Sequence, residues 1–532
     1  MHNKLSKLTI LFSVLVVSGL GFWACQTLST TNTNQPDTAR ALGTAEDVES
    51  LIRGSMLQWW LGAENGSGIE HMATMGDALT WSWGNYGSRE MSSEPRIPYP
   101  NRTDWRYSGA LELPWNDFYG ALSSASDGLR QIRDEGLEIV DATRTHRAEA
   151  FAKFVQGLCL GSLACYYDQA FILNETVNLE TDVLELQPYT QVMDAAIAAL
   201  EESISLSQSG PAFTLEDDWI NGLTPSNTDL AKIAHSFIAR FLAQVARDPG
   251  ERAAVNWAKV KSEAEAGITE DFAPVGDGTE DDWWHSQQWF HNDRGDTWGR
   301  VDYKHIGGAD ESGGYQAWLA LPAAQRKEFD MVVSDKRISG MTIADFEGRD
   351  VDGGTYIGNF GPSPFPPSRG TYHHSKYGYY RYEEHQLSGG SNPMPTLLTT
   401  ELDLLIAEAF LRMNDGASAA ALINKTRTGN GGYPALDGTE PIGSPTDPRS
   451  PLPGKSLWAM LKYEKGIECI QTGFGIDYFD NRGWGDLVPG TPIHAPLPAA
   501  ELEVLQMPLY TFGGQGGPGS APKESGRNLH VQ

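Results

Sequence analysis

Helical periodicity in several separate blocks constrains the fold of this chain more than any other feature. Residues 151–165 place apolar or small side chains at the i, i+3, i+4 and i+7 positions of one helix face, and 189–200, 230–245 and 257–268 repeat the spacing. Blocks 402–413 with 417–426, and 457–470, follow. Short turns separate them, and the strict repeat motif is absent. The chain is therefore predicted to be predominantly α, with an irregular tetratricopeptide-like helical repeat scaffold.

Two long segments interrupt this pattern, residues 66–114 and 274–395. Both are rich in Gly, Pro and aromatic residues and show no sustained period. Segments of that length inside a compact protein usually carry function, so we expect them to be loop-rich inserts that face a ligand. Short strands are expected at 331–333 and 377–382.

The N-terminus has the pattern of an export signal. Lys4 and Lys7 precede an apolar run, and small residues lead to Cys25. The pattern resembles a bacterial lipoprotein signal, which predicts a signal at 1–24, lipid attachment at Cys25, a tether at 25–45 and a single domain at 46–532. A plain signal peptide, or a membrane span near the lower limit of about 17 residues, is the alternative.

Charge and cysteine content exclude several classes of function. The formal net charge is −29, which repels phosphate backbones and disfavours nucleic acid as a partner. Cys159, Cys165 and Cys469 show no zinc spacing and are expected to be small core residues. Asp350 and Asp352 lack the distal Glu of a calcium loop. We therefore expect no metal and no cofactor.

No motif of a known catalytic centre stands in a suitable context. G-x-S-x-G, the Walker loop and H-E-x-x-H are absent. The adjacent acids Asp281-Asp282 and Glu383-Glu384 leave open a helical glycoside hydrolase or lyase that uses Asp281, Asp282 or Glu384. Adjacent acids in a chain this acidic are more often a solvated surface.

Aromatic residues in the inserts are the stronger candidates for a ligand site. A flat ring stacks on the apolar face of a sugar or on a peptide side chain with little loss of side-chain entropy. The alternative is that these rings pin the inserts to the helical body. The ligand-binding candidates are Trp81, Trp83, Tyr86, Trp283, Trp284, Trp289, Tyr377, Tyr379 and Tyr380.

Short segments along nearly the whole chain, taken in order, resemble the SusD/RagB family of outer-membrane lipoproteins. They include a W-x-x-x-Y element at 115–119, a signature helix at 151–171, P-Y-x-x-V at 188–192, A-E-A at 407–409, Y-E-K-x-x-E at 463–468 and D-x-R at 480–482. At 168–170 the sequence Asp-Gln-Ala replaces the family's Gly-Asp-x-Pro turn.

The resemblance implies a non-enzymatic protein at the cell surface that captures oligosaccharides, or peptides, and passes them to a SusC-like TonB-dependent barrel transporter. It implies a site built from the inserts on the helical scaffold. We expect Glu464, Glu468 and Arg482 to form a structural ion network instead of contacting ligand. A scaffold protein without a small ligand remains a third possibility.

Overall fold

The computed structural model describes residues 42–81, 86–179, 181–280, 282–292, 299–342, 355–362 and 375–522. Contacts divide the chain into two units, Met1–Thr44 and Ala45–Gln532, and every element below belongs to the second. The predicted signal, Cys25 and nearly all of the tether lie outside the described residues. Within those residues, no helix has both the length and the hydrophobicity needed to cross a membrane.

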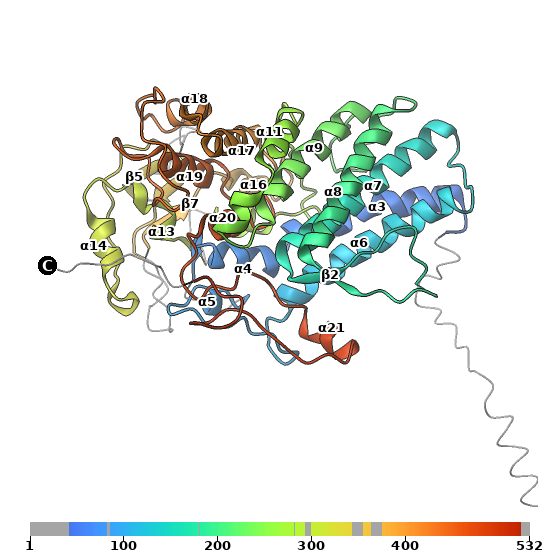
Figure 1. Cartoon of the computed structure of the whole chain (residues 1–532), viewed down its shortest axis with the longest axis horizontal. Helices are drawn as coiled ribbons and strands as arrows, with labels where there is room; N and C mark the ends of the chain where they lie inside the picture. Colours follow the sequence, from blue (N-terminus) through green and yellow to red (C-terminus); the bar gives the residue numbers. More distant parts are fainter. Residues whose placement is uncertain are drawn as a thin grey trace, which may run out of the picture. The chain divides into compact units, whose positions relative to one another are not determined.

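A series of packed helices forms the scaffold, and each contacts the next along the chain (Figure 1). The predominantly α, tetratricopeptide-like prediction is confirmed. These helices are α3 (Ala45–Glu64), α6 (Gly109–Arg133), α7 (Ala142–Tyr166), α8 (Tyr189–Gln208), α9 (Asn227–Gln244), α11 (Trp257–Glu265), α17 (Thr399–Arg412), α18 (Gly416–Arg427) and α19 (Leu457–Glu468).

Local capping explains where several of these helices begin. Asp141 accepts a hydrogen bond from the backbone N–H of Arg144, which caps α7. Ser226 and Asp229 form a reciprocal capping box at the start of α9. Pro188 precedes α8, where its missing N–H removes no helix hydrogen bond. Asp248 both follows α9 and caps α10 (Pro249–Ala254). The side chains of Asp141, Ser226 and Asp248 satisfy backbone donors that a helix start leaves without partners.

Helix α6 begins earlier than the sequence indicates. The W-x-x-x-Y element at 115–119 lies inside α6, which starts within the first predicted insert. Pro114 is tolerated there because Tyr166 donates its hydroxyl to the Ala110 carbonyl, at 3.4 Å, in place of the N–H that proline lacks. The first insert is also shortened from its N-terminal side, since residues 67–75 form the fully buried helix α4 (Ser67–Met75).

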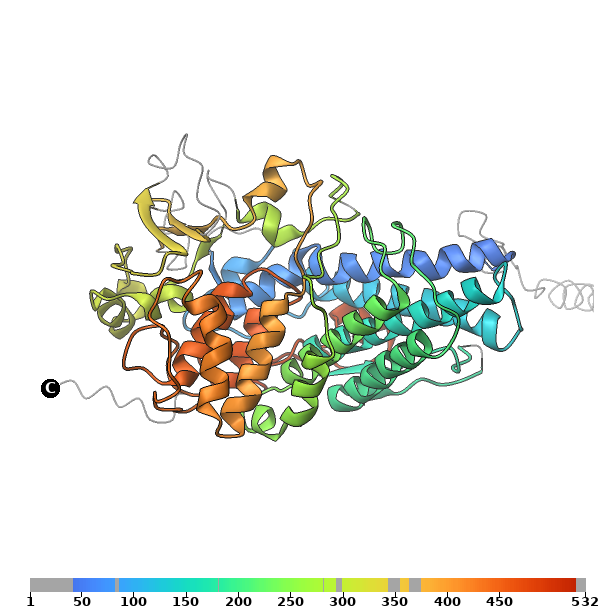
Figure 2. The same cartoon turned by 90° about the horizontal axis from the view of Figure 1, so that it is seen from above.

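The inserts add short elements that lie beside the helical series (Figure 2). Their strands are β1 (Leu79–Thr80), β4 (Arg300–Val301), β5 (Ile338–Thr342), β6 (Ile357–Asn359) and β7 (Tyr377–Tyr379). Their helices are α5 (Ser88–Met91), α12 (Ser286–Phe290), α13 (Tyr303–Ile306), α14 (Gly314–Ala320) and α16 (Glu383–Leu387). Strand β1 pairs antiparallel with β4, whereas β6 lies between a parallel β5 and an antiparallel β7. The remaining elements are β2 (Gln169–Phe171), β3 (Leu186–Pro188), α20 (Ile476–Trp484) and α21 (Ala499–Val504).

One of the two expected strands forms. Strand β7 confirms the prediction at 377–382 over its first three residues. The prediction at 331–333 is wrong, because this segment pairs with no described strand: two of its N–H groups donate to side chains, and the Val332 carbonyl accepts from the loop N–H of Glu311 at 2.8 Å. The N–H of Met331 donates to the Tyr377 hydroxyl, and the N–H of Val332 donates to the carboxylate of Asp310.

Buried charges join the second insert to the helical series. Arg337 is fully buried and donates to Asp335, Glu464 and Glu468. The acidic pair of α19 was expected to involve Arg482, but Arg482 donates to backbone carbonyls, including Ala246 O at 3.1 Å. Arg337 is so distant in sequence from Glu464 and Glu468 that no local pattern predicts the pairing. Cys159, Cys165 and Cys469 are free and buried, as expected.

Candidate functional site

Helix α12 presents aromatic rings that are only half buried. Trp289 and Phe290 end this short helix, and Tyr86 comes from the first insert. The rings of Tyr86 and Phe290 lie 6.0 Å apart, and Trp289 lies 4.2 Å from the buried Trp284. We call Tyr86, Trp289 and Phe290 the α12 rings. They bring together residues more than 200 positions apart in the sequence.

The rest of α12 fixes the helix to its surroundings. Gln287 donates to the Ile69 carbonyl at 3.1 Å, and Gln288 donates to the carbonyls of Pro395 and Gln471 at 3.0 and 3.1 Å. Helix α12 contacts both α4 and α16. The yellow-green and orange helices at the upper edge of Figure 2 are α12 and α16. The side chains of Gln287 and Gln288 are thus buried, whereas those of Trp289 and Phe290 lie at the boundary with solvent.

Polar groups lie near the α12 rings. Gln386 of α16 donates to the Trp289 carbonyl at 2.7 Å, and Glu280 is exposed near Tyr86. Burial raises the pKa of the Tyr86 hydroxyl to about 12, with Glu70 and Glu280 adding to the effect. The phenol thus stays neutral and able to donate at any physiological pH. Apolar ring faces with hydroxyl, amide and carboxylate groups nearby suit a ligand that is flat, apolar on its faces and rich in hydroxyls.

Most of the ring candidates from the sequence lie in the interior instead. Only Tyr86 and Trp289 are half buried, and Trp83 lies outside the described residues. The buried candidates, with their exposed fractions, are Trp81 at 0%, Trp283 at 7%, Trp284 at 5%, Tyr377 at 0%, Tyr379 at 1% and Tyr380 at 7%. In this structure, these six rings present no open face on which a ligand could stack.

The buried rings build a core for the inserts. Trp81, Tyr377 and Tyr379 belong to one hydrophobic cluster that also includes Ile467 of α19. The Tyr379 hydroxyl donates to the Ala78 carbonyl at 2.6 Å, which links the two inserts. Short strands cannot bury enough aliphatic surface, so large rings take that role. The alternation of Tyr377 and Tyr379 was the available signal, because side chains two apart in a strand share a face.

Of the carboxylates considered for hydrolysis, the two that the structure describes are not enclosed. Asp282 is half buried, Glu384 is exposed in the first turn of α16, and Asp281 lies outside the described residues. Among the described residues, no group of three or more His, Cys, Asp or Glu is placed to hold a metal ion.

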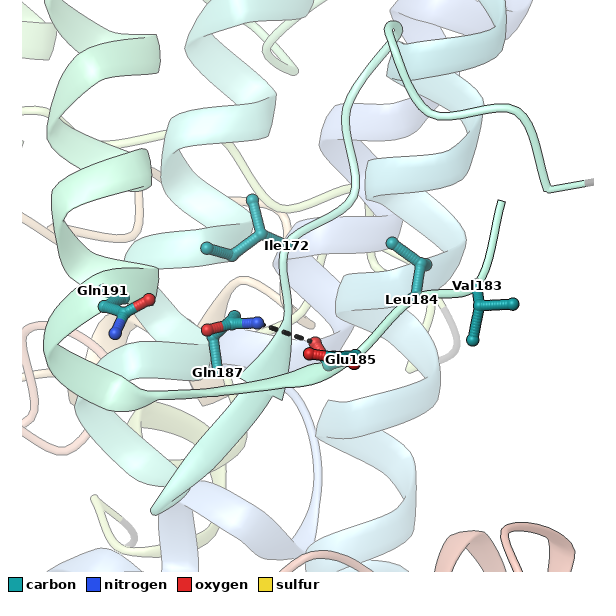
Figure 3. Close-up of a pocket in the computed structure, with 6 residues that line it drawn as sticks. All are labelled: Ile172, Val183, Leu184, Glu185, Gln187 and Gln191. Atoms are coloured by element: carbon teal, nitrogen blue, oxygen red, sulfur yellow. Dashed lines mark hydrogen bonds between the residues drawn. The ribbon is translucent and has the colours of Figure 1, made fainter. Parts of the chain in front are cut away.

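A shallow hollow of about 410 Å³ lies elsewhere, between the β2–β3 ribbon and the start of α8. Figure 3 shows Ile172 and Leu184 together with the amides of Gln187 and Gln191 around this hollow. Its other lining residues are Val183 and Glu185. Aromatic side chains are absent from this described lining, so it offers hydrogen bonds and aliphatic contact but no stacking surface.

Comparison with solved structures identifies the fold. No family model matches this sequence, and neither does any curated protein. A SusD superfamily protein from Bacteroides fragilis matches with a TM-score of 0.52 and 14% identity, over 87% of this chain and 98% of that chain. A SusD homolog from Bacteroides thetaiotaomicron matches with a TM-score of 0.52 and 13% identity, over 90% and 91%. A SusD-like protein from Bacteroides fragilis gives 0.50 and 13%, over 84% and 88%.

These matches extend over most of each chain, so the likeness includes the inserts as well as the helical series. The chain has the SusD-like fold, a helical repeat scaffold with loop-rich inserts. The fold expected from the ordered sequence segments is therefore confirmed.

Proposed function

We propose that this chain is a SusD/RagB family protein that binds oligosaccharides without changing them and delivers them to a SusC-like TonB-dependent transporter. The observation that carries the proposal is the exposure of the α12 rings on an insert of a SusD-like fold. Trp289 and Phe290 keep part of their surface in contact with solvent, although most rings of the inserts are buried. An apolar face retained at the surface is typical of a ligand site.

Sugar binding fits the chemistry around these rings better than catalysis does. A pyranose offers an apolar face for stacking and equatorial hydroxyls at its edge, which match the Tyr86 hydroxyl, Gln386 and Glu280 nearby. A peptide ligand remains the close variant, because ring faces accept aliphatic side chains equally well. In this proposal, the half-buried Asp282 and the exposed Glu384 are solvated surface residues and take no part in catalysis.

Export and anchoring complete the proposal. We infer that residues 1–24 are removed, that Cys25 carries lipid in the outer membrane and that 25–45 tethers a single surface-exposed domain at 46–532. Cys25→Ala is expected to leave the protein unlipidated and to move it from the membrane fraction to the soluble fraction. Recovery of lipidated Cys25→Ala protein would show that the anchor has been misplaced.

Calorimetry with a panel of soluble glycans and peptides tests the binding function. We expect saturable binding of at least one glycan, with no new products after prolonged incubation. Trp289→Ala and Phe290→Ala should each weaken it about tenfold, which corresponds to about 1.4 kcal/mol. Phe410→Ala, which removes a half-buried ring from α17 of the scaffold, is the matched control and should leave affinity unchanged.

Other outcomes separate the alternatives. Products that accumulate with time would favour the hydrolase or lyase. Binding of peptides alone would change the ligand class but keep the site. Glycan binding that survives both ring substitutions would place the site elsewhere, and the hollow beside α8 would be the next candidate.

A further inference from the structure

Two neighbouring residues of α4 bond to the backbone of Tyr86 and to His291, the residue after Phe290. Glu70 and His71 are 1% and 0% exposed. His71 donates from Nε2 to the backbone carbonyl of Tyr86, because a carbonyl only accepts. Its Nδ1 must then be the acceptor of the Tyr99 hydroxyl, at 2.5 Å. The imidazole therefore has a defined tautomer that points its donor at the Tyr86 backbone.

Glu70 acts on the other side, through the end of α12. Its Oε2 lies 2.7 Å from Nε2 of His291, which is the C-cap residue of α12. The backbone N–H of His291 donates in turn to the Gln287 carbonyl at 3.2 Å, one turn before the ring of Phe290. His291 is 1% exposed, so the carboxyl–imidazole pair is shielded from water. Buried hydrogen bonds of this kind fix geometry more strictly than exposed ones.

A second carboxyl–imidazole pair lies at the opposite end of α12. His285 is the N-cap residue and accepts from the Gln288 N–H through its side chain. Its Nε2 lies 3.4 Å from Oε2 of Glu64 of α3, and both residues are fully buried. Helix α12 is thus bounded by two histidines, each facing a carboxyl group of α3 or α4.

The backbone at Tyr86 shows why such fixing is needed. Tyr86 has φ of 55°, a left-handed conformation that costs free energy for a residue with a side chain. Gly87 follows with φ of 71°, and a Cβ there would lie 2.7 Å from the Trp105 ring. Conformations of this kind persist only where the surroundings over-determine them, and they cluster at functional sites. His71 donates a hydrogen bond to the carbonyl of this strained residue.

We propose that Glu70 and His71 are positioning residues, which set the separation and tilt of the Tyr86 and Phe290 rings for ligand. His71 fixes the strained Tyr86 backbone, Glu70 fixes α12 through His291, and helix α4 provides a common base for both. The consequence for affinity rests on the proposed function, whereas the consequence for ring geometry does not. Helix α4 has no contact with ligand in this scheme and acts only through the two rings.

Hydrogen–deuterium exchange and a crystal structure of Glu70→Leu test the positioning without any ligand. Loss of the acceptor for His291 should raise deuterium uptake at least threefold in peptides that cover 286–292, and should change the 6.0 Å separation of the Tyr86 and Phe290 rings. Glu70→Gln keeps an oxygen that accepts from His291 and should restore both values. Glu49→Leu is the matched control, since Glu49 is a 7% exposed carboxylate that pairs with Arg144 and Arg147 of α7.

Binding of the glycan panel then gives the functional readout. Glu70→Leu should weaken whichever glycan binds about tenfold, whereas Glu70→Gln and Glu49→Leu should not. His71→Gln, which retains a donor near the Tyr86 carbonyl, should bind more tightly than His71→Leu. If no glycan binds the wild type, the proposed function fails while exchange and ring separation still decide the positioning. Unchanged uptake and ring separation in Glu70→Leu would overturn the inference.

Discussion

Arg337 and Glu464 form a two-point ion pair, with guanidinium–carboxylate distances of 2.7 and 3.0 Å, and neither side chain is exposed. One residue precedes strand β5 of the second insert, and the other lies in the middle of α19. Asp335 and Glu468 also accept from the same guanidinium. A buried cation of the insert, Arg337, is therefore paired with a buried carboxylate of the scaffold, Glu464. This pair stabilises the fold only while both partners are present, because either one alone would be a buried, unpaired charge.

Arg337→Met is expected to lower the free energy of unfolding by about 3–5 kcal/mol, because it leaves the buried carboxylates of Asp335 and Glu464 without their cation. Glu468 would keep its longer contact with the Arg381 cation, at 3.7 Å. Chemical denaturation measures the loss. The matched control is Lys425→Ala, which breaks the exposed ion pair with Asp403 and should cost less than about 1 kcal/mol. Equal losses from both substitutions would mean that the buried network contributes no more than a surface contact.

Buried histidines should make the protein less stable in acid. Burial lowers the pKa of His71 to about 4, and that of His285 and His305 to about 3. The unfolded chain binds protons at these residues below about pH 6.5, whereas the folded chain does not. The contribution of these histidines to stability is then complete above that pH and is lost as the pH drops towards 4. Thermal unfolding between pH 7 and pH 4.5 measures this dependence.

His305 offers a direct check of the acid dependence. Its Nε2 lies 3.0 Å from the Gly466 carbonyl, and His305→Gln keeps a donor there without a titrating group. The variant should lose less stability than the wild type between pH 6.5 and 4.5. A pH dependence identical to that of the wild type would show that His305 contributes nothing to it.

Glu64 should act in the opposite direction. Burial raises its pKa to about 8, opposed in part by Arg240 and the Phe474 N–H. The Phe474 N–H does not reach hydrogen-bonding geometry, since neither carboxyl oxygen of Glu64 has a protein hydrogen bond within the described part of the chain. The folded form keeps its proton between about pH 4.5 and pH 8, while the unfolded form loses it. Raising the pH through this window should therefore reduce stability, and Glu64→Gln should remove that part of the dependence. A variant that retains the full wild-type slope would refute the assignment.

Tyr379→Phe separates a structural ring from a binding ring. It removes the hydroxyl that donates to the Ala78 carbonyl but keeps the buried ring, so we expect a loss of about 1 kcal/mol in stability. Affinity for any bound glycan should stay the same, in contrast to Trp289→Ala. A selective loss of affinity in Tyr379→Phe would return Tyr379 to the binding site.

The scaffold could be predicted from periodicity, because the buried residues of helices such as α7 and α9 recur at helical spacing within the local sequence. Helix α6 was missed at its start because Pro114 and Gly109 indicate a break, and only the distant hydroxyl of Tyr166 compensates for it. The order of the short family-like segments along the chain indicated the fold, although no single segment did so. Fold information in this chain is thus mostly local, with a few non-local exceptions.

The candidate site is harder to predict from the sequence than the scaffold is. Clusters of rings in loops suggested stacking surfaces, but Trp81 and Tyr377 fill the interior of the inserts. Burial in an irregular segment has no period, so sequence cannot separate a core ring from a surface ring there. Glu70 and His71 stand in a short buried helix without any motif, and their roles depend on contacts 15 and 221 positions away.

Helix α12 divides its few residues between two tasks. Gln287 and Gln288 hold the backbone by bonds to carbonyl groups, while Trp289 and Phe290 take no part in those bonds. Two adjacent residues therefore form much of the surface at the end of α12. Substituting either residue leaves the hydrogen bonds of Gln287 and Gln288 intact. Under the proposed function, such an arrangement would let ligand preference change at Phe290 with little effect on the interior, whereas Trp289 also packs on the buried Trp284.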